Sequence, residues 1–259
     1  MGEAALNLSI QCVFCAALTE TPMKFIFTLL MICSLAMPAL AADVQPTDEW
    51  KNSSEIGALQ TSGNTRTLTL NAKTRMSHEG RHLRDTFEAS AHAATDRNTT
   101  TAEKYTASLQ EDWKITDRDY LLLRIGFITD RFSGFRRRTS ETIGYGRDLI
   151  KSDAFEWNME LGGGLRQSKL TNNTSNNESI VRGSTRAQWQ IADSATLIQK
   201  LSTEGGKSGW ASKSVTALQQ KINSHLASKI SLTLEHNSKV PTGRKKLDIE
   251  TAITLVVNY

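Results

Sequence analysis

The sequence predicts an all-β fold, an antiparallel transmembrane β-barrel of about 12 strands preceded by a cleavable signal peptide. Three observations predict it. The final segment, 246–259, alternates apolar and polar residues and ends on the aromatic Tyr259. Similar alternating segments fill the preceding chain, and no long run repeats apolar residues with the 3.6-residue period of a helix. Beyond the first 41 residues, proline occurs only as Pro46 and Pro241, outside the predicted strand interiors, as a sheet requires.

The amino-terminal residues predict export. Met23 and Lys24 begin a basic start, and the apolar run 25–37 leads to a small-residue A-x-A site that predicts cleavage after Ala41. The run has 13 residues, whereas a spanning helix needs about 20, so an uncleaved anchor is the disfavoured alternative. We therefore divide the chain into a non-native or unstructured extension (1–22), a signal peptide (23–41), a short periplasmic leader (42–48) and the barrel (49–259).

The composition of the mature chain excludes several classes of function. Residues 42–259 hold 30 basic and 25 acidic residues, an excess too small to indicate a nucleic-acid partner. All three cysteines (Cys12, Cys15 and Cys33) precede the predicted cleavage site, so no disulfide or cysteine-based metal site is expected. His78, His82, His92 and His225 show no spacing typical of metal ligands. We expect no cofactor and no metal.

The predicted strands are separated by turn-forming residues. Their ranges are 49–61, 66–78, 81–93, 100–115, 119–132, 136–150, 154–168, 178–192, 195–204, 210–225, 228–239 and 246–259. If both ends of the mature chain lie in the periplasm, the periplasmic turns at 79–80, 116–118, 151–153, 192–194 and 226–227 are short. The outer connections 95–99, 169–177, 205–209 and 240–245 are longer on average, which is the pattern of outer-membrane barrels. Two outer connections, 62–65 and 133–135, are short.

The aromatic residues predict two interfacial girdles. Trp50, Trp113, Tyr120, Phe155, Trp157, Trp189 and Tyr259 fall near the periplasmic ends of predicted strands, and Tyr105, Phe132, Phe135 and Trp210 near the outer ends. Amphipathic rings settle at the headgroup level of a bilayer. A secreted soluble all-β binding protein would instead bury such rings in mid-strand, and it is the alternative that this distribution disfavours.

The alternation assigns one face of each strand to lipid and the other to the lumen. The inward face carries charges of both signs. The expected lumen charges are Arg75, Arg84, Glu88, Arg124, Asp130, Glu156, Glu160, Arg166, Arg182, Arg186, Glu235 and Glu250. Twelve strands can leave a narrow channel or be filled by such groups, and the sequence does not choose between these two. Gly126, Gly144, Gly146, Gly162 and Gly164 on the same face would relieve crowding, widen the bore or mark curvature.

Several motifs resemble one family of proteobacterial barrels. Glu55-Ile56-Gly57-Ala58 leads into Thr61-Ser62-Gly63-Asn64-Thr65, Asp130–Arg138 reads DRFSGFRRR, and Gly144-Tyr145-Gly146 and Leu161–Arg166 (LGGGLR) follow. These stretches are similar to the T-x-G-N-T, D-R-F-x-G-x-x-x-R, G-x-G and G-G-G-x-R motifs of outer-membrane proteins described as salt-induced, a domain-of-unknown-function family. The resemblance implies an outer-membrane barrel and a link to salt or osmotic stress, and it implies no established activity. Tyr259 departs from the phenylalanine that ends many barrels.

Basic residues gather at the predicted outer turns. Arg131, Arg136, Arg137, Arg138, Arg244 and Lys245 form an expected rim that attracts lipopolysaccharide phosphates or small anions. The alternative is a solvated rim without a selected ligand.

One enzymatic hypothesis remains. His236 and Ser238 stand two residues apart on one face of a predicted strand, and Glu250 lies beyond them, a spacing that resembles outer-membrane lipid hydrolases. Glu250 has inward parity, so it does not orient the histidine without a bulge.

We therefore expect a non-enzymatic outer-membrane barrel of a Gram-negative bacterium, exported through a Sec-type signal peptide, that serves as a narrow pore or a structural envelope protein. The expected partners are outer-membrane lipid, lipopolysaccharide and the barrel-assembly machinery, which would bind the carboxy-terminal strand. The lipid hydrolase and the soluble binding protein are the alternatives.

Overall fold

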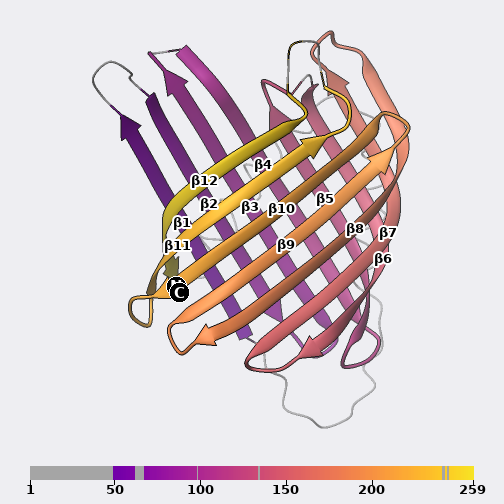
Figure 1. The fold of residues 1–259 in the computed structure, drawn as a ribbon. Helices are drawn as coiled ribbons and strands as arrows, with labels where there is room; N and C mark the ends of the chain where they lie inside the picture. Colours follow the sequence, from indigo (N-terminus) through magenta and orange to yellow (C-terminus); the bar gives the residue numbers. More distant parts are fainter. Residues whose placement is uncertain (1–48, 62–66, 98, 134, 241–242, 244) are drawn as a thin grey trace, which may run out of the picture. The chain divides into compact units, whose positions relative to one another are not determined.

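The computed structural model describes residues 49–61, 67–97, 99–133, 135–240, 243 and 245–259. Within them the chain forms twelve β-strands, each antiparallel to its neighbours in the sequence. The last strand returns to the first, so the sheet closes into a barrel (Figure 1). The predicted all-β, twelve-stranded antiparallel barrel is confirmed. The predicted extension, signal peptide and leader lie outside the described residues. Among the described residues, no helix is long and apolar enough to span a membrane.

The strands follow the predicted alternating segments closely. They are β1 (Glu49–Thr61), β2 (Thr67–Glu79), β3 (Leu83–Asp96), β4 (Thr99–Lys114), β5 (Asp119–Asp130), β6 (Phe135–Lys151), β7 (Phe155–Leu170), β8 (Ser175–Ala192), β9 (Ala195–Gly206), β10 (Gly209–Lys221), β11 (Leu226–Asn237) and β12 (Leu247–Asn258). We call the end of the barrel that holds Trp50 and Tyr259 the terminal end, and the opposite end the far end.

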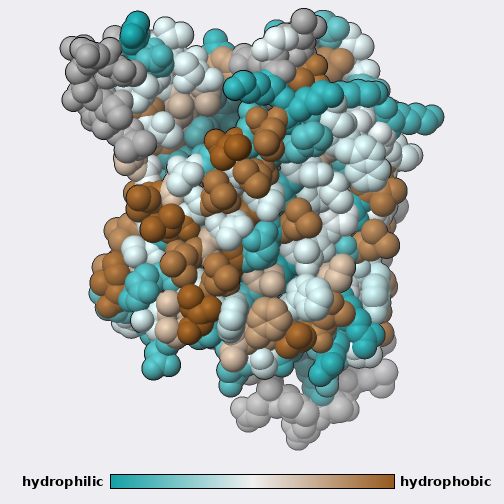
Figure 2. All heavy atoms as spheres, viewed as in Figure 1, coloured by the Kyte–Doolittle hydropathy of each residue, from teal (hydrophilic) through white to brown (hydrophobic). Residues whose placement is uncertain are grey.

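The outer face of the barrel is apolar. Large hydrophobic side chains of alternate strand positions are exposed, and Figure 2 shows them gathered over the face that β9 to β12 present. Examples are Leu201, Leu218, Ile230, Leu232, Ile249 and Ile253. Because the alternate positions hold charged and polar groups that face one another inside the ring, the hydrophobic surface is on the outside, as a barrel in lipid requires.

Two of the predicted connections are wrong. The predicted outer loop 169–177 is shorter, because β8 begins at Ser175 and Leu170 donates a backbone hydrogen bond to the carbonyl of Thr174 (2.8 Å). Beyond the apolar belt water solvates polar side chains on both faces, so an asparagine-rich segment can continue a strand. The predicted turn 226–227 lies instead at 222–225, where the Asn223 side chain accepts from the backbone N–H groups of His225 and Leu226 (both 2.9 Å).

The far-end connections are also shorter than predicted at two other places. β3 ends at Asp96 and β4 begins at Thr99, and β9 ends at Gly206 and β10 begins at Gly209. The strands therefore extend into the predicted loops 95–99 and 205–209.

Most predicted girdle residues lie on the outer face, but two do not. Trp50, Trp113, Trp157, Trp189, Tyr259, Tyr105 and Trp210 are exposed. Tyr120 and Phe135 are buried, which contradicts the girdle assignment. Tyr120 faces the charged lumen, and an irregularity in the ladder between Phe135 and Arg137 turns Phe135 inward.

Candidate functional site

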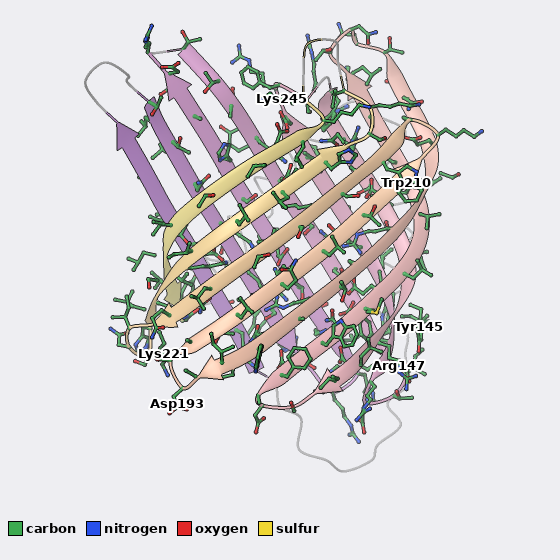
Figure 3. All side chains as sticks on the ribbon, viewed as in Figure 1. Tyr145, Arg147, Asp193, Trp210, Lys221 and Lys245 are labelled. Atoms are coloured by element: carbon green, nitrogen blue, oxygen red, sulfur yellow. The ribbon has the colours of Figure 1, made fainter. Side chains whose placement is uncertain are left out.

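The lumen is the only place in the described chain where many charged groups converge, and it is the candidate site. Figure 3 shows all the described side chains on the ribbon, and its labels mark the two ends of the barrel, with Trp210 and Lys245 toward the far end and Asp193 and Lys221 at the terminal end. Successive residues of a strand alternate between the two faces, so each strand contributes a row of inward groups.

An ion pair joins opposite walls of the barrel. Arg75 of β2 donates from Nη1 to Oε1 of Glu88 on the neighbouring β3. Lys200 Nζ of β9 lies 3.2 Å from the same oxygen. Five strands separate β3 from β9 on either side of the ring, so Lys200 and Glu88 meet across the lumen. Their side chains obstruct the bore where they meet.

A second pair crosses the lumen nearer the far end. Lys104 of β4 donates to Oε2 of Glu235 on β11. Lys213 of β10 approaches the other oxygen of the same carboxylate, with Nζ 2.7 Å from Oε1. One carboxylate therefore holds two ammonium groups, one of them from across the bore.

Two inward arginines contact only amides. Arg124 Nη1 donates to Gln110 Oε1 (3.4 Å), and Arg186 Nη2 donates to Gln188 Oε1 (2.8 Å). Among the described residues neither makes an ion pair. Together with Arg75 and Lys200, they leave the middle of the lumen with more positive than negative side chains.

A buried side-chain network lines the lumen in the terminal half of the barrel, on β3 to β6. Arg84 Nε donates to Asp112 Oδ2 (2.8 Å), and its guanidinium lies 4.6 Å from the centre of the Tyr120 ring. Asp112 and Tyr120 are both buried. Gly146 makes this packing possible, because a Cβ there would lie 2.3 Å from the Tyr120 ring. This glycine therefore relieves crowding, one of the roles that the sequence left open.

A similar network lies at the far end of β7 to β10. Arg166 Nη2 donates to Glu178 Oε1 (2.7 Å), and Nη1 donates to Glu204 Oε1 (3.1 Å). The backbone N–H of Ser208 donates to the other oxygen of Glu178 (2.7 Å). The turn between β9 and β10 is thus fastened to the lumen wall.

The structure brings together most of the predicted lumen charges. Arg75 meets Glu88, Arg84 meets Asp112, Arg182 meets Glu160 (3.2 Å), and Arg166 meets Glu178. Glu250 lies 3.5 Å from His92 Nδ1. Glu156 is exposed near the terminal end. Asp130 Oδ1 accepts from the backbone N–H of Phe132 in the far-end turn (2.9 Å).

Sequence reasoning missed several other inward charged residues that form ion pairs in the lumen. They are Glu55, Lys104, Asp112, Glu178, Lys200, Glu204, Lys213 and Lys229. The alternation of apolar and polar residues around them indicates that they face the lumen. It does not reveal which inward groups meet across the ring, because that depends on the closure of the barrel.

The predicted basic rim divides into two groups. Arg136 and Arg137 are exposed, as is Lys245, and Arg131 pairs with Glu103 (3.3 Å). Arg138 points inward, where its guanidinium lies 4.0 Å from the Phe135 ring centre and Nε donates to Ser168 Oγ (3.1 Å). Its assignment to the rim is therefore wrong, because Arg138 lies on the same inward parity of β6 as Gly144 and Gly146. Arg244 lies outside the described residues.

The groups of the enzymatic hypothesis do not come together. Ser238 Oγ accepts from the backbone N–H of Trp210 (2.8 Å) and lies past the end of β11. His236 is exposed on the outer face. Glu250 is turned to His92 on β3 instead of His236. The described residues thus hold no serine–histidine–carboxylate arrangement at this position.

Comparisons with known proteins agree with this architecture. The chain is 30% identical over 200 residues to the uncharacterized protein YdiY of Escherichia coli K12, which covers 77% of this chain and 79% of that protein. Among solved structures, an outer-membrane channel from Pseudomonas putida F1 has a TM-score of 0.50 at 9% identity and covers 85% of this chain and 97% of that one. The NanC porin has a TM-score of 0.48 at 11% identity, covering 80% and 97%. At 9% identity the likeness to the Pseudomonas channel concerns the fold alone.

The family comparison covers the strands that build the lumen. Residues 54–259 match the model of a family described as "Protein of unknown function, DUF481", which takes in nearly all of the barrel from β1 to β12. This match includes the predicted motifs around Asp130–Arg138 and Leu161–Arg166. The chain belongs to the DUF481 family.

Proposed function

We propose that the protein is a narrow, anion-preferring channel in the outer membrane of a Gram-negative bacterium, with the terminal end in the periplasm. The observation that carries the proposal is the central lumen, where Glu88 is surrounded by Arg75 and Lys200 while Arg124 and Arg186 bind only amides. An excess of fixed positive charge in a confined bore raises the local concentration of anions. The pair across the lumen keeps the bore narrow, so we expect a low conductance.

The rest of the proposal follows from the sequence. A Sec-type signal peptide would export the chain, and the barrel-assembly machinery would bind β12 through its aromatic end. Arg136 and Arg137 stand at the far end, with Arg137 in register with Lys169 on β7. We propose that these residues contact lipopolysaccharide phosphates, because guanidinium groups bind phosphate oxygens in a bidentate manner. Induction by salt or osmotic stress is proposed on the family resemblance alone.

Planar-bilayer recording of the purified protein tests the channel. In a salt gradient we expect small, discrete conductance steps and a reversal potential that indicates anion preference. Replacing the central cations in Arg124→Gln/Arg186→Gln should reduce the anion preference. The matched control, Arg136→Gln/Arg137→Gln, removes the same charge outside the bore and should change it less. A barrel that stays electrically silent with both lumen cations present would overturn the channel and leave a structural role.

A further inference from the structure

The barrel closes by a short seam. β1 and β12 form only four register pairs, from Ser53 with Asn258 to Ile56 with Leu255. β1 nevertheless continues to Thr61 in full register with β2, and β12 begins at Leu247 in full register with β11. Figure 1 shows the two strands diverging toward the far end, with β12 in yellow leaning away from β1 in indigo. The far half of the seam is therefore unpaired within the described residues.

Unpaired strand edges are unfavourable in a bilayer. In an antiparallel ladder the backbone groups of alternate residues point to the partner strand. The Tyr259 N–H donates to the Asn52 carbonyl (3.1 Å), so the same alternation directs the backbone of Ala58 on β1 and of Thr251 on β12 toward the missing neighbour. Gly57 still lies against β12, because a Cβ there would lie 2.8 Å from the carbonyl oxygen of Ile253. Each unsatisfied backbone group in hydrocarbon loses a hydrogen bond without compensation from water. The edges therefore require a partner with hydrogen-bonding groups.

The outward-facing residues on both sides of the seam are apolar. Ile56 on β1 and Ile253 on β12 are 69% and 70% exposed, and Ile249 is 64% exposed. Together with Ile143 and Leu161 on fully paired strands, these three are among the most exposed of the large hydrophobic side chains. An acyl chain would pack between them at the level of the bilayer core.

The inner side of the seam is polar and carries both signs of charge. Gly57, Asn71, His92 and Lys104 are register partners on β1 to β4. Glu250 of β12 reaches over the side chain-free Gly57 to His92, and Lys104 crosses behind the seam to Glu235 beside Lys213. Asp248 is in register with Glu235. The ammonium groups of Lys104 and Lys213 and the carboxylates of Asp248 and Glu250 complement a headgroup with one phosphate and one ammonium.

A buried hydroxyl at the point where the strands part is unsatisfied. Thr254 is 8% exposed, and its Oγ1 has no hydrogen-bond partner among the described residues. It stands directly beside Gly57, where an added Cβ would lie 2.8 Å from Thr254 Cγ2. A buried hydroxyl without a partner is unfavourable, so this position favours an acceptor such as an ester carbonyl.

We propose that the far half of the β1–β12 seam is a lateral binding site for a zwitterionic phospholipid. The headgroup lies in the lumen against Lys104, Lys213 and the carboxylates of β12. The glycerol esters accept hydrogen bonds at Thr254 and along the unpaired edges, and an acyl chain leaves past Ala58, beyond the contact between Gly57 and Ile253. This site connects the lumen to the bilayer sideways, in addition to the axial channel proposed above. It does not depend on whether that channel conducts.

The seam itself is tested with paired cysteines, since the described residues contain no cysteine. Ser54 and Val257 are register partners, and facing residues of such a pair are about 5.5 Å apart at Cα, within reach of a disulfide. Ser54→Cys/Val257→Cys should oxidise readily in phospholipid vesicles. Ala58→Cys/Ile253→Cys would be the next pair of the same kind if the ladder continued, and it should oxidise at least tenfold more slowly. Equal rates would show a closed seam and overturn the site.

The occupant is tested on the unaltered protein in vesicles that contain phosphatidylethanolamine with a photoactivatable group in the acyl chain. With that group on the first carbons of the chain, next to the glycerol ester, the site predicts labelling of the lumen-facing Thr254 and Glu250 in addition to the outer surface. Gln110, which faces the lumen on β4, should remain unlabelled. Absence of label at Thr254 and Glu250 would overturn the proposal. Stronger labelling there by phosphatidylglycerol would overturn the zwitterionic headgroup, and crosslinking of two Ile253→Cys chains to each other would assign the edge to a second copy.

Discussion

Lys200 of β9 and Glu88 of β3 stand on opposite walls of the barrel and meet in its centre, with Nζ 3.2 Å from Oε1. Both side chains are partly buried, and Arg75 also contacts the carboxylate. A single ion pair thus sets the width of the bore at this level. Its two partners are 112 positions apart in the sequence, so only closure of the ring brings them together.

Truncation of the Lys200 side chain should widen the bore. In Lys200→Ala the side chain that crosses the bore is lost, and we expect the single-channel conductance to increase several-fold. The measurement is planar-bilayer recording at fixed salt concentration. Lys221→Ala is the matched control, because Lys221 is exposed at the terminal end of β10, and it should leave the conductance near that of the unaltered protein. An unchanged conductance in Lys200→Ala would place the narrowest point elsewhere.

Neighbouring positions of β11 should differ in how much stability a new charge costs. Leu232 is exposed on the apolar outer face, whereas Thr233 faces the lumen in register with Glu250. Arginine on a lipid-facing position near the bilayer midplane costs about 2–4 kcal/mol, so Leu232→Arg should lower the free energy of unfolding by that amount. Thr233→Arg gains a carboxylate neighbour and should cost much less. Urea titration in phospholipid vesicles measures both, and similar losses would mean that the two faces have been exchanged.

The architecture could be predicted because it depends on local alternation. The final segment, with Ile249 and Ile253 on one face and Glu250 on the other, shows the two environments of a barrel wall within a few residues. The same rule failed at Phe135, which an irregularity in the ladder turns inward although its position in β6 predicts the outer face. Such irregularities insert a residue without a sequence signal of their own.

The contents of the lumen could be predicted only as a set of charges. The sequence indicates that Glu88 and Glu160 face inward, but the pairs Lys200–Glu88 and Lys104–Glu235 depend on the ring closure. The shortness of the β1–β12 seam was likewise beyond sequence reasoning. Alternation predicts that both strands extend to the far end, and it does not predict that they part beyond Gly57.

Removal of the Ser238 hydroxyl should have no effect on lipid cleavage, because we expect the protein to cleave none. Ser238 Oγ accepts from the backbone N–H of Trp210, and His236 is not its partner in the described structure. We expect no lipid-cleaving activity from either the unaltered protein or Ser238→Ala when phospholipid vesicles are analysed for released fatty acid. Cleavage by the unaltered protein that Ser238→Ala abolishes would restore the hydrolase hypothesis. His236→Ala serves as the second test, since a base is required for activation of a serine.

Two arginine–glutamate pairs at the far end should differ strongly in their contribution to stability. The Arg166 side chain is 2% exposed and pairs with Glu178, whereas the Arg131 side chain is 68% exposed and pairs with Glu103. Removal of one partner from a buried pair leaves an uncompensated charge and costs about 3–5 kcal/mol, and exposed pairs contribute about 0–1 kcal/mol. Arg166→Met should therefore lower the free energy of unfolding in vesicles by several kcal/mol, and Arg131→Met should hardly change it. Arg166 also holds the β9–β10 turn through Glu178 and Ser208, so Arg166→Met should increase proteolysis at Lys207, which lies in that turn. Equal stability of the two variants would mean that water reaches Arg166 through the far end of the lumen and screens the pair as it does at the surface.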